Sequence, residues 1–362
     1  QTTPAAIPPG GFDPSGPVKI ALLTPASASN QGAAALGQAL ANAARIGLAD
    51  LGDPLVELDI YDTAGDPARA TTAAAEAIAG GAKIILGPLF GANTRAIAST
   101  AAANNLKVLS FSTDSTIAGG PVYLSGFLPE KAASRIMQFA AARGLEPLGI
   151  YYPQTPIGEI ALRGAQAAAG PRLVSVTGYP RSQQGIEQTS RNFAAAARSA
   201  GARGLLLAES GQALALVASQ LQPLGITNDR YRFLGLGQWN SKQTLTIQEL
   251  QGGWFPAPDP NAMTAFINRY RERYGSVPPA LAVLGYDAMQ IVGQMLATAR
   301  ANGSKDPFAT AVLTRPQGFR GAVGPIRFDG SGKGERGMVI LEVGSGSFDV
   351  IDPVPVSFGA GT

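Results

Sequence analysis

Short strand-like runs alternate with longer, alanine-rich segments of helical periodicity along most of this chain. The first run, 18–23, is followed by a helical segment at 31–51, and the alternation then repeats. This order is typical of α/β units, because each helix carries the chain back so that the next strand can join a parallel sheet. We therefore predict an α/β fold.

The alternation predicts two sets of elements. The first set has strands at 18–23, 56–61, 83–86 and 107–110, with helices at 31–51, from 66 onward and at 93–104. The second set has strands at 148–152, 172–179, 204–208 and 231–236, with helices at 130–143, 158–169, 187–200 and 211–224. The 362 residues are about twice the usual length of a single domain. We expect two doubly wound, Rossmann-like lobes.

The last third of the chain lacks a third set of this kind. Asp259-Pro260 and Asp306-Pro307 each pair a helix-capping acid with proline, which predicts two helix starts. A long helix is expected at 280–301, and strands at 318–328 and 338–343. Helices without matching parallel strands have to pack on a lobe that already exists, so the chain is expected to return to the first lobe and to end in the second.

This return requires three crossovers, which we place near Tyr123, Gly253 and Gly318. The predicted N-terminal lobe is 18–122 with 253–318, and the predicted C-terminal lobe is 123–252 with 319–356. Residues 1–17 are rich in Pro, Gly and Thr and are expected to form a disordered tether. A ligand cleft is expected between the two lobes.

The composition excludes several classes of function. The chain has no Cys and no His, so thiol nucleophiles, Ser-His-Asp triads, imidazole bases and ordinary zinc sites are absent. The net charge is only +3 and no basic run occurs, so no nucleic-acid partner is expected. No apolar run approaches the roughly 20 residues that cross a bilayer, which predicts a soluble chain. We expect a protein that is not an enzyme and holds no cofactor.

Two local patterns resemble ligand motifs but fail in detail. Asp59, Asp62 and Asp66 lack the EF-hand spacing, and Asp66 is explained as the cap of a helix that starts at Pro67. The glycine-rich stretch 330–334 lacks the spacing of a phosphate-binding loop and a following helix, so we expect a turn there. No metal site is expected.

The strand ends resemble those of type I periplasmic binding proteins, the fold of the leucine/isoleucine/valine receptors. The resemblance is carried by Gly87-Pro88-Leu89-Phe90, Val108-Leu109-Ser110-Phe111-Ser112-Thr113, Gly149-Ile150-Tyr151-Tyr152 with Gly158, and Gly324-Pro325-Ile326-Arg327-Phe328-Asp329-Gly330-Ser331-Gly332. It covers nearly everything from Val18 to Pro353. It implies two hinged lobes, three crossovers and a small-molecule cleft between the lobes.

Within that superfamily, two stretches look most like the penicillin-binding protein activators, the lipoprotein LpoA-like branch. One is Leu234-Gly235-Leu236-Gly237-Gln238-Trp239. The other is Gly252-Gly253-Trp254-Phe255-Pro256-Ala257-Pro258-Asp259-Pro260, followed by Phe266, Tyr270 and Tyr274. This branch implies an envelope protein whose lobes contact a peptidoglycan synthase.

Candidate ligand-binding residues follow from the position of the loops. In doubly wound sheets, ligands bind beyond the carboxyl ends of the strands, where helix N-termini offer backbone N–H groups. The candidates in these loops are Ser27, Phe90, Asn93, Ser112, Thr113 and Asp114 in the first lobe, and Thr155, Ile157, Glu209, Ser210, Gln238 and Trp239 in the second. The resemblance implies that Ser112 and Thr113 contact a ligand carboxylate.

Three positions depart from the amino-acid receptors of this fold. The chain has Gly91-Ala92-Asn93 where those receptors often carry adjacent serines, and Ile157 where an aromatic residue often precedes a glycine. Gln238 stands where an acid usually pairs with the ligand ammonium, and Glu209 is a candidate replacement for that acid. These departures predict weak or no binding of ordinary aliphatic amino acids.

Each candidate also has a purely structural explanation. Ser112 and Asn93 stand where strand ends and helix caps favour such residues in any case. The same explanation applies to Glu209 and Gln238, although an acid at a strand end that faces a cleft is less easily dismissed. Trp239 is better explained by packing near a crossover than by stacking on a ligand.

Three functions remain open. We favour a non-enzymatic periplasmic protein of the penicillin-binding protein activator type, with a peptidoglycan synthase as its partner. The alternative is a solute receptor for an ABC importer, which closes by hinge motion on an amino acid or another small polar molecule and contacts an ABC permease. A hydrolase is disfavoured by the lack of His. A lipidated cysteine ahead of Gln1 would make the protein a membrane-anchored lipoprotein.

Overall fold

A parallel sheet with strand order β2-β1-β3-β4-β5 forms the centre of the first unit in the computed structural model, which describes residues 13–355 and Phe358. Its strands are β1 (Val18–Thr24), β2 (Val56–Asp62), β3 (Ala82–Leu86), β4 (Lys107–Ser110) and β5 (Val122–Leu124). The helices of this unit are α1 (Gln31–Leu51), α2 (Pro67–Ala79), α3 (Gly91–Ala103), α9 (Pro260–Tyr274), α10 (Val283–Asn302) and α11 (Thr310–Leu313).

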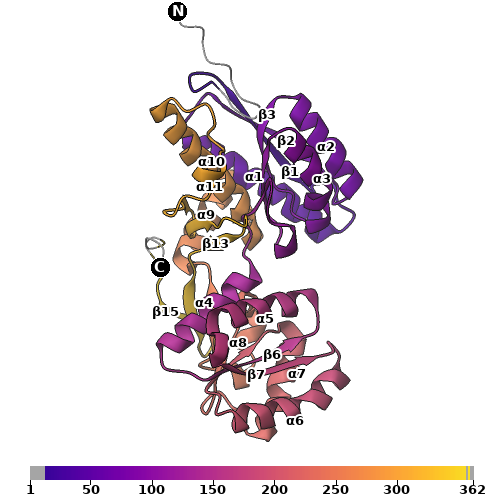
Figure 1. Cartoon of the computed structure of the whole chain (residues 1–362), viewed down its shortest axis with the longest axis vertical. Coiled ribbons are helices and arrows are strands. Elements are labelled where there is room, and N and C mark those ends of the chain that lie inside the picture. Colours follow the sequence, from indigo (N-terminus) through magenta and orange to yellow (C-terminus); the bar gives the residue numbers. More distant parts are fainter. Residues whose placement is uncertain (1–12, 356–357, 359–362) are drawn as a thin grey trace, which may run out of the picture. The chain divides into compact units, whose positions relative to one another are not determined.

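Strand β1 is covered by helices on both faces. Val18, Ile20 and Leu22 lie in one core with residues of α1 and α10. Because successive side chains of a strand point to opposite faces, Ala21 and Leu23 point to the other layer and are buried there as well. Helices α2 and α3 form that second layer (Figure 1). The alternation seen in the sequence therefore produces a helix–sheet–helix arrangement.

The helix starts follow the capping signals of the sequence. Asn30 accepts a hydrogen bond from the Ala33 N–H at the start of α1. Asp66 accepts one from the Arg69 N–H, and Pro67 is the first residue of α2. These caps direct each chain segment away from the carboxyl end of the preceding strand.

The second unit has its own sheet, with strand order β15-β14-β10-β9-β8-β6-β7. Its strands are β6 (Leu148–Pro153), β7 (Leu173–Tyr179), β8 (Gly204–Leu207), β9 (Arg232–Leu234), β10 (Trp254–Ala257), β14 (Val339–Val343) and β15 (Phe348–Asp352). Its helices are α4 (Pro129–Ala142), α5 (Pro156–Ala169), α6 (Gln183–Ser199), α7 (Gly211–Leu221) and α8 (Lys242–Leu245). The strands from β6 to β10 pair in parallel, and β14 and β15 continue the sheet in antiparallel fashion.

Strand β8 separates the two cores of this unit. Leu205 and Leu207 pack with α6 and α7, whereas Leu206 packs with α4 and α5 on the other face. The α/β fold with two doubly wound units and parallel sheets is therefore confirmed.

The division of the chain differs from the sequence prediction. The first unit contains the described chain up to Phe127 and Pro260–Gly337, and the second contains Leu128–Asp259 and Met338–Pro355. Residues 319–337, which we assigned to the C-terminal lobe, thus belong to the first unit. Their strands form a small antiparallel sheet of β11 (Phe319–Gly321), β12 (Gly324–Phe328) and β13 (Gly334–Arg336), and Phe319, Ile326 and Phe328 pack in the α1–α10 core. Strand periodicity alone does not say which core a strand joins.

Two local predictions were wrong. The expected single strand at 318–328 is a hairpin, in which β11 and β12 pair antiparallel. Asp306-Pro307 does not start a helix: it lies in a turn, and α11 begins at Thr310. The predicted start at Asp259-Pro260 is correct, since α9 begins at Pro260.

The predicted tether is partly outside the described residues, which exclude 1–12. Residues 13–17 are ordered, because the Gly16 N–H donates to the Asp13 carbonyl and the Gly16 carbonyl accepts from Arg300. The lipid anchor stays a prediction.

One helical stretch, Ala280–Asn302, has the length and composition of a membrane span, contrary to our expectation from hydropathy. It contains α10, whose residues Met289, Val292 and Met295 are fully buried in the first unit. Its apolar character is explained by this packing.

Candidate functional site

The strand order of each unit creates a position where ligands bind in doubly wound folds. In the second unit β6 and β8 are neighbours, yet the helices that follow them, α5 and α7, pack on opposite faces of the sheet. The loops after these two strands therefore separate at the carboxyl edge and leave a crevice, which is the topological switch point of the sheet. In the first unit the equivalent neighbours are β1 and β3.

A pocket of about 410 Å³ lies at the switch point of the second unit. It is lined by residues at or just beyond the carboxyl ends of four parallel strands of this sheet: Pro153, Thr155, Pro156, Ile157, Arg181, Ala208, Glu209, Ser210 and Gln238. Its volume is in the range of small-molecule sites. Five of the six candidates predicted in the second unit, all except Trp239, line this single pocket.

Helix starts position two of these side chains. Thr155 is the N-cap of α5, and its hydroxyl accepts from the Gly158 N–H at 3.3 Å. Ser210 precedes α7 as its N-cap, but its hydroxyl makes no hydrogen bond within the described part of the chain. The Ser210 hydroxyl is therefore available to a ligand, whereas that of Thr155 already accepts one hydrogen bond.

Among the described residues that line the pocket, Glu209 is the only acid, and it is 6% exposed. Its carboxylate accepts from Tyr179 Oη at 3.2 Å, from Arg181 Nη2 at 3.0 Å and Nε at 3.1 Å, and from the Ser210 N–H at 3.0 Å. The oxygens of Glu209 therefore already have hydrogen-bond partners within the protein, an arrangement that disfavours the predicted role of Glu209 as the acid that pairs with a ligand ammonium.

The ionisation of the network supports this arrangement. Burial, together with the charge of Glu209, raises the pKa of Tyr179 far above its usual range, so its hydroxyl remains a donor. The hydrogen bond and the charge of Glu209 raise the pKa of Arg181. Glu209 and Arg181 therefore form an ion pair at the edge of the pocket.

Trp239 does not line the pocket. Its side chain is fully buried, and its indole N–H donates to the Glu209 carbonyl at 3.2 Å. The expectation of a ligand contact is corrected by this burial, which agrees with the packing explanation. A Cβ at Gly235 would lie 2.1 Å from the Trp239 ring and one at Gly253 would lie 2.9 Å from it, so the glycines of both activator-like stretches make room for this indole. Trp254, in the second stretch, packs on Phe139.

In the first unit, Ser112 and Asp114 lie against the start of α3. A Cβ at Gly91 would meet the Ser112 hydroxyl and the Asp114 side chain at 3.2–3.3 Å. Ser112 is buried and accepts from the Asp114 N–H, while Thr113 is exposed. Asp114 pairs with Arg95 at 3.0 Å. Partial burial would raise the pKa of Asp114, but the hydrogen bonds from Thr116 and Arg95 lower it below its ordinary value.

Asn93 is 1% exposed, and neither atom of its side-chain amide has a hydrogen-bond partner among the described residues. Thr24, at the end of β1, has a buried hydroxyl in the same state. Thr24 ends β1 and Asn93 lies in the first turn of α3, so both flank the switch-point loops of the first unit. Phe90, the N-cap residue of α3, is partly exposed. Buried polar groups are normally paired, so this edge holds unused hydrogen-bonding capacity.

Ser27 has a structural partner. Its backbone N–H and its hydroxyl both donate to Asp62, at the end of β2. This pairing, which is reinforced by Arg69, ties the loop after β1 to the neighbouring strand. Among the first-unit candidates, Ser27 thus already uses its backbone N–H and its hydroxyl in structural hydrogen bonds.

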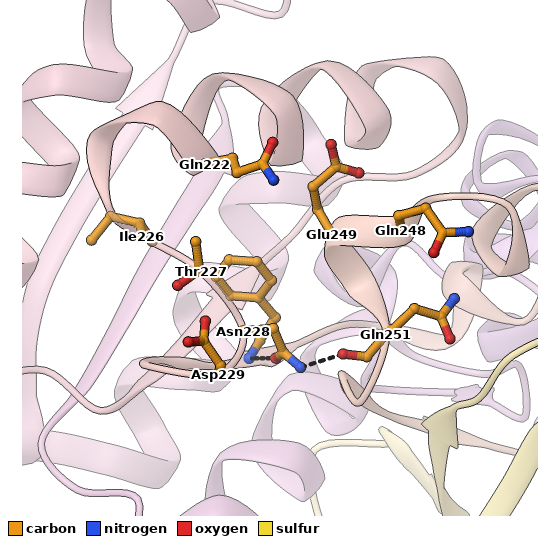
Figure 2. Close-up of a pocket in the computed structure, with 9 residues that line it drawn as sticks. Gln222, Ile226, Thr227, Asn228, Asp229, Gln248, Glu249 and Gln251 are labelled. Atoms are coloured by element: carbon orange, nitrogen blue, oxygen red, sulfur yellow. Dashed lines mark hydrogen bonds between the residues drawn. The ribbon is translucent and has the colours of Figure 1, made fainter.

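Another pocket of the second unit, about 250 Å³ in volume, lies around Asn228. Figure 2 shows that Asn228 bridges two backbone groups: it donates to the Gln251 carbonyl at 2.5 Å and accepts from the Phe233 N–H at 2.6 Å. The residues around it precede β9 and β10, so this pocket lies at the amino ends of these strands. Ligands of doubly wound sheets bind at the opposite edge.

Arg181 is a pocket residue that was not among the candidates predicted from the sequence. It follows β7, an edge strand whose carboxyl end pairs with the end of β6 at Tyr179 and Pro153. The loop after the predicted strand 172–179 was therefore a signal that could have been used. Its pairing with Glu209, which is distant in sequence, could not be read from spacing.

Comparisons with known proteins agree with this architecture. A family model described as periplasmic binding protein matches residues 17–347. A comparison with curated proteins finds no match. Among solved structures, a branched-chain amino acid ABC transporter periplasmic ligand-binding protein from Burkholderia xenovorans is 19% identical, with a TM-score of 0.71, over 95% of this chain and 96% of that one.

Two further structures were solved with ligands. A solute-binding protein of an ABC transporter from Rhodopseudomonas palustris, in complex with 3,4-dihydroxy benzoic acid, is 18% identical with a TM-score of 0.62, over 95% of this chain and 97% of that one. The branched-chain amino acid transporter substrate-binding protein from Streptococcus pneumoniae, in complex with isoleucine, is 15% identical with a TM-score of 0.60, over 93% and 100%. At these identities the likeness shows the fold alone. With the family model matching almost the whole chain, the protein belongs to the type I periplasmic binding protein family.

Proposed function

We propose that this protein is a non-enzymatic, periplasmic solute receptor that delivers a small organic molecule to an ABC permease. The observation that carries this proposal is the pocket of about 410 Å³ at the switch point of the second unit, which gathers Thr155, Ser210 and Gln238 from separate loops. An apolar wall with a few convergent polar groups is the usual form of a small-molecule site.

The loops of the first unit are proposed as the second binding surface. Thr113 is exposed there, and Asn93 and Thr24 keep unpaired polar atoms among the described residues.

The activator role is supported by sequence resemblance alone. Three of the residues that carry that resemblance, Gly235, Trp239 and Gly253, pack in the interior of the second unit. These three are explained by folding, and a peptidoglycan synthase partner is one of the outcomes that the test below distinguishes.

The proposal is tested by thermal unfolding of the full chain in the presence of amino acids, aromatic acids, nucleobases and muropeptide fragments. A ligand at a hundred times its Kd adds about 2.7 kcal/mol of stability, which raises Tm by a few degrees. Ser210→Trp, which fills the pocket, is expected to abolish the shift, and Ser199→Trp, on the exposed surface of α6, is the matched control. If no compound raises Tm and the immobilised chain binds a peptidoglycan synthase, the activator role replaces this proposal.

A further inference from the structure

The hydrogen-bonding state of Glu209 determines which chemical groups the pocket can accept. An ionised carboxylate has about four acceptor positions. Glu209 receives hydrogen bonds from Tyr179 Oη, from Arg181 Nη2 and Nε, and from the Ser210 N–H, all within 3.2 Å. A ligand ammonium would have to displace one of these donors, and three of them belong to a buried hydroxyl or to a charged group.

The charge of Glu209 is also cancelled. Arg181 approaches it with two nitrogens, in the geometry that makes arginine–carboxylate pairs strong. The Glu209 side chain is almost completely buried, while about half of the Arg181 side chain remains exposed (52%). The positive partner of the pair is therefore the one that a solute meets.

Three further polar groups of the pocket can donate hydrogen bonds to a solute. Nη1 of Arg181, the Ser210 hydroxyl and the Gln238 amide make no hydrogen bonds within the described residues. Thr155 and Ser210 are the N-cap residues of α5 and α7, so the N-termini of these helices, which favour negative charge, open onto the same pocket. Ile157, which is 48% exposed, provides an apolar contact beside them.

We propose that this pocket takes the carboxylate or other oxygen-rich end of an organic acid that has no amino group, and that it discriminates against an ammonium. Keto, hydroxy and aromatic carboxylic acids belong to this class. The inference rests on the proposed receptor function and specifies its solute. Arg181 determines the specificity, because it donates to the ligand and at the same time withdraws Glu209 from it.

The test compares pairs of solutes in which the α-ammonium group of an amino acid is replaced by a keto oxygen. Calorimetry on the full chain measures Kd for leucine and for the keto acid of leucine, and for phenylalanine and phenylpyruvate. We expect each keto acid to bind at least about tenfold more tightly than its amino acid, the difference of one charge-assisted hydrogen bond. Tighter binding of the amino acids would overturn the inference and leave the receptor function standing. If only a solute of another class binds, such as a nucleobase, the inference fails and the receptor function stands. If no solute binds, both fail.

Variants identify the residue responsible. Arg181→Leu releases the Glu209 carboxylate, so it is expected to reverse the preference within each pair, whereas Arg191→Leu, an exposed arginine on α6, should leave it unchanged. Unchanged preference in Arg181→Leu would overturn the inference. If Arg181→Leu does not fold, the double variant Arg181→Leu/Glu209→Gln removes both charges together. It should weaken keto-acid binding about tenfold without strengthening amino-acid binding, and unaltered keto-acid binding would contradict the assignment.

Discussion

Arg336 Nη1 donates to Asp287 Oδ2 at 2.6 Å, and both side chains are buried in the first unit. Arg336 Nε also donates to the Ser125 carbonyl at 2.7 Å, and the guanidinium lies over the ring of Phe127. The chain leaves this unit after Phe127 and again after Gly337. Ser125 and Phe127 therefore lie at the first of these exits, and Arg336 lies at the second. Through Arg336, the ion pair therefore connects both of these chain segments to α10, the helix that carries Asp287.

Removing one partner of this pair should destabilise the protein strongly. Arg336→Met leaves Asp287 as a buried charge that still accepts from the Ala322 N–H, and is expected to cost about 3–5 kcal/mol. The measurement is the free energy of unfolding in urea. Arg320→Met, at an exposed arginine of β11, should change it by no more than about 0.5 kcal/mol. Equal effects of the two variants would contradict the structural role of the pair.

Asn93 is expected to oppose stability in the absence of solute. Asn93→Leu removes a buried amide with no partner among the described residues, so the unliganded protein should gain about 1–3 kcal/mol. The neighbouring Thr94 provides the contrast: its hydroxyl is 2.8 Å from Ser110 Oγ, and Thr94→Val should lose about 1 kcal/mol. Urea unfolding of both variants decides the matter, and a loss of stability in Asn93→Leu would show that the amide is satisfied.

The stability of the protein should depend on the space that Gly235 leaves for the Trp239 indole. In Gly235→Ala the new Cβ would overlap the indole, so we expect a loss of about 1–3 kcal/mol together with weaker solute binding, because Trp239 holds the Glu209 backbone. Gly330→Ala is the control, since a Cβ added there would meet no atom within 4 Å. Calorimetric unfolding of the two variants makes the comparison, and unchanged stability in Gly235→Ala would refute the packing.

Much of the fold, and part of the site, could be predicted from the sequence. Alternating strands and helices place the carboxyl ends of β6, β8 and β9 at one edge, so Thr155, Glu209 and Gln238 meet there as expected. The state of these residues could not be predicted. The spacing of the residues does not show that Arg181 forms an ion pair with Glu209. The burial of Trp239 depends on how distant segments pack. For the same reason, local patterns did not reveal which core the hairpin of β11 and β12 joins.

Acid should weaken the loop that contains Asp114. The pKa of Asp114 is lowered in the folded protein, so the folded state binds fewer protons than the unfolded chain, whose aspartates titrate near about 3.9. The contribution of Asp114 to stability is therefore complete above that pH and is lost as pH falls through the lower, folded pKa. Asp114→Asn and Arg95→Gln should both flatten the acid limb of a plot of urea midpoint against pH. An acid limb as steep as that of the wild type in both variants would contradict this account.

The location of the solute is the central claim, and hydrogen exchange tests it most directly. The full chain is compared with and without a saturating concentration of the acid that binds most tightly. We predict slower amide exchange in 154–158 and 208–211, which follow β6 and β8, and no change in 226–229 and 248–251, around the Asn228 pocket. Slower exchange confined to the Asn228 segments, or no change at the carboxyl edge of the second unit, would contradict the account.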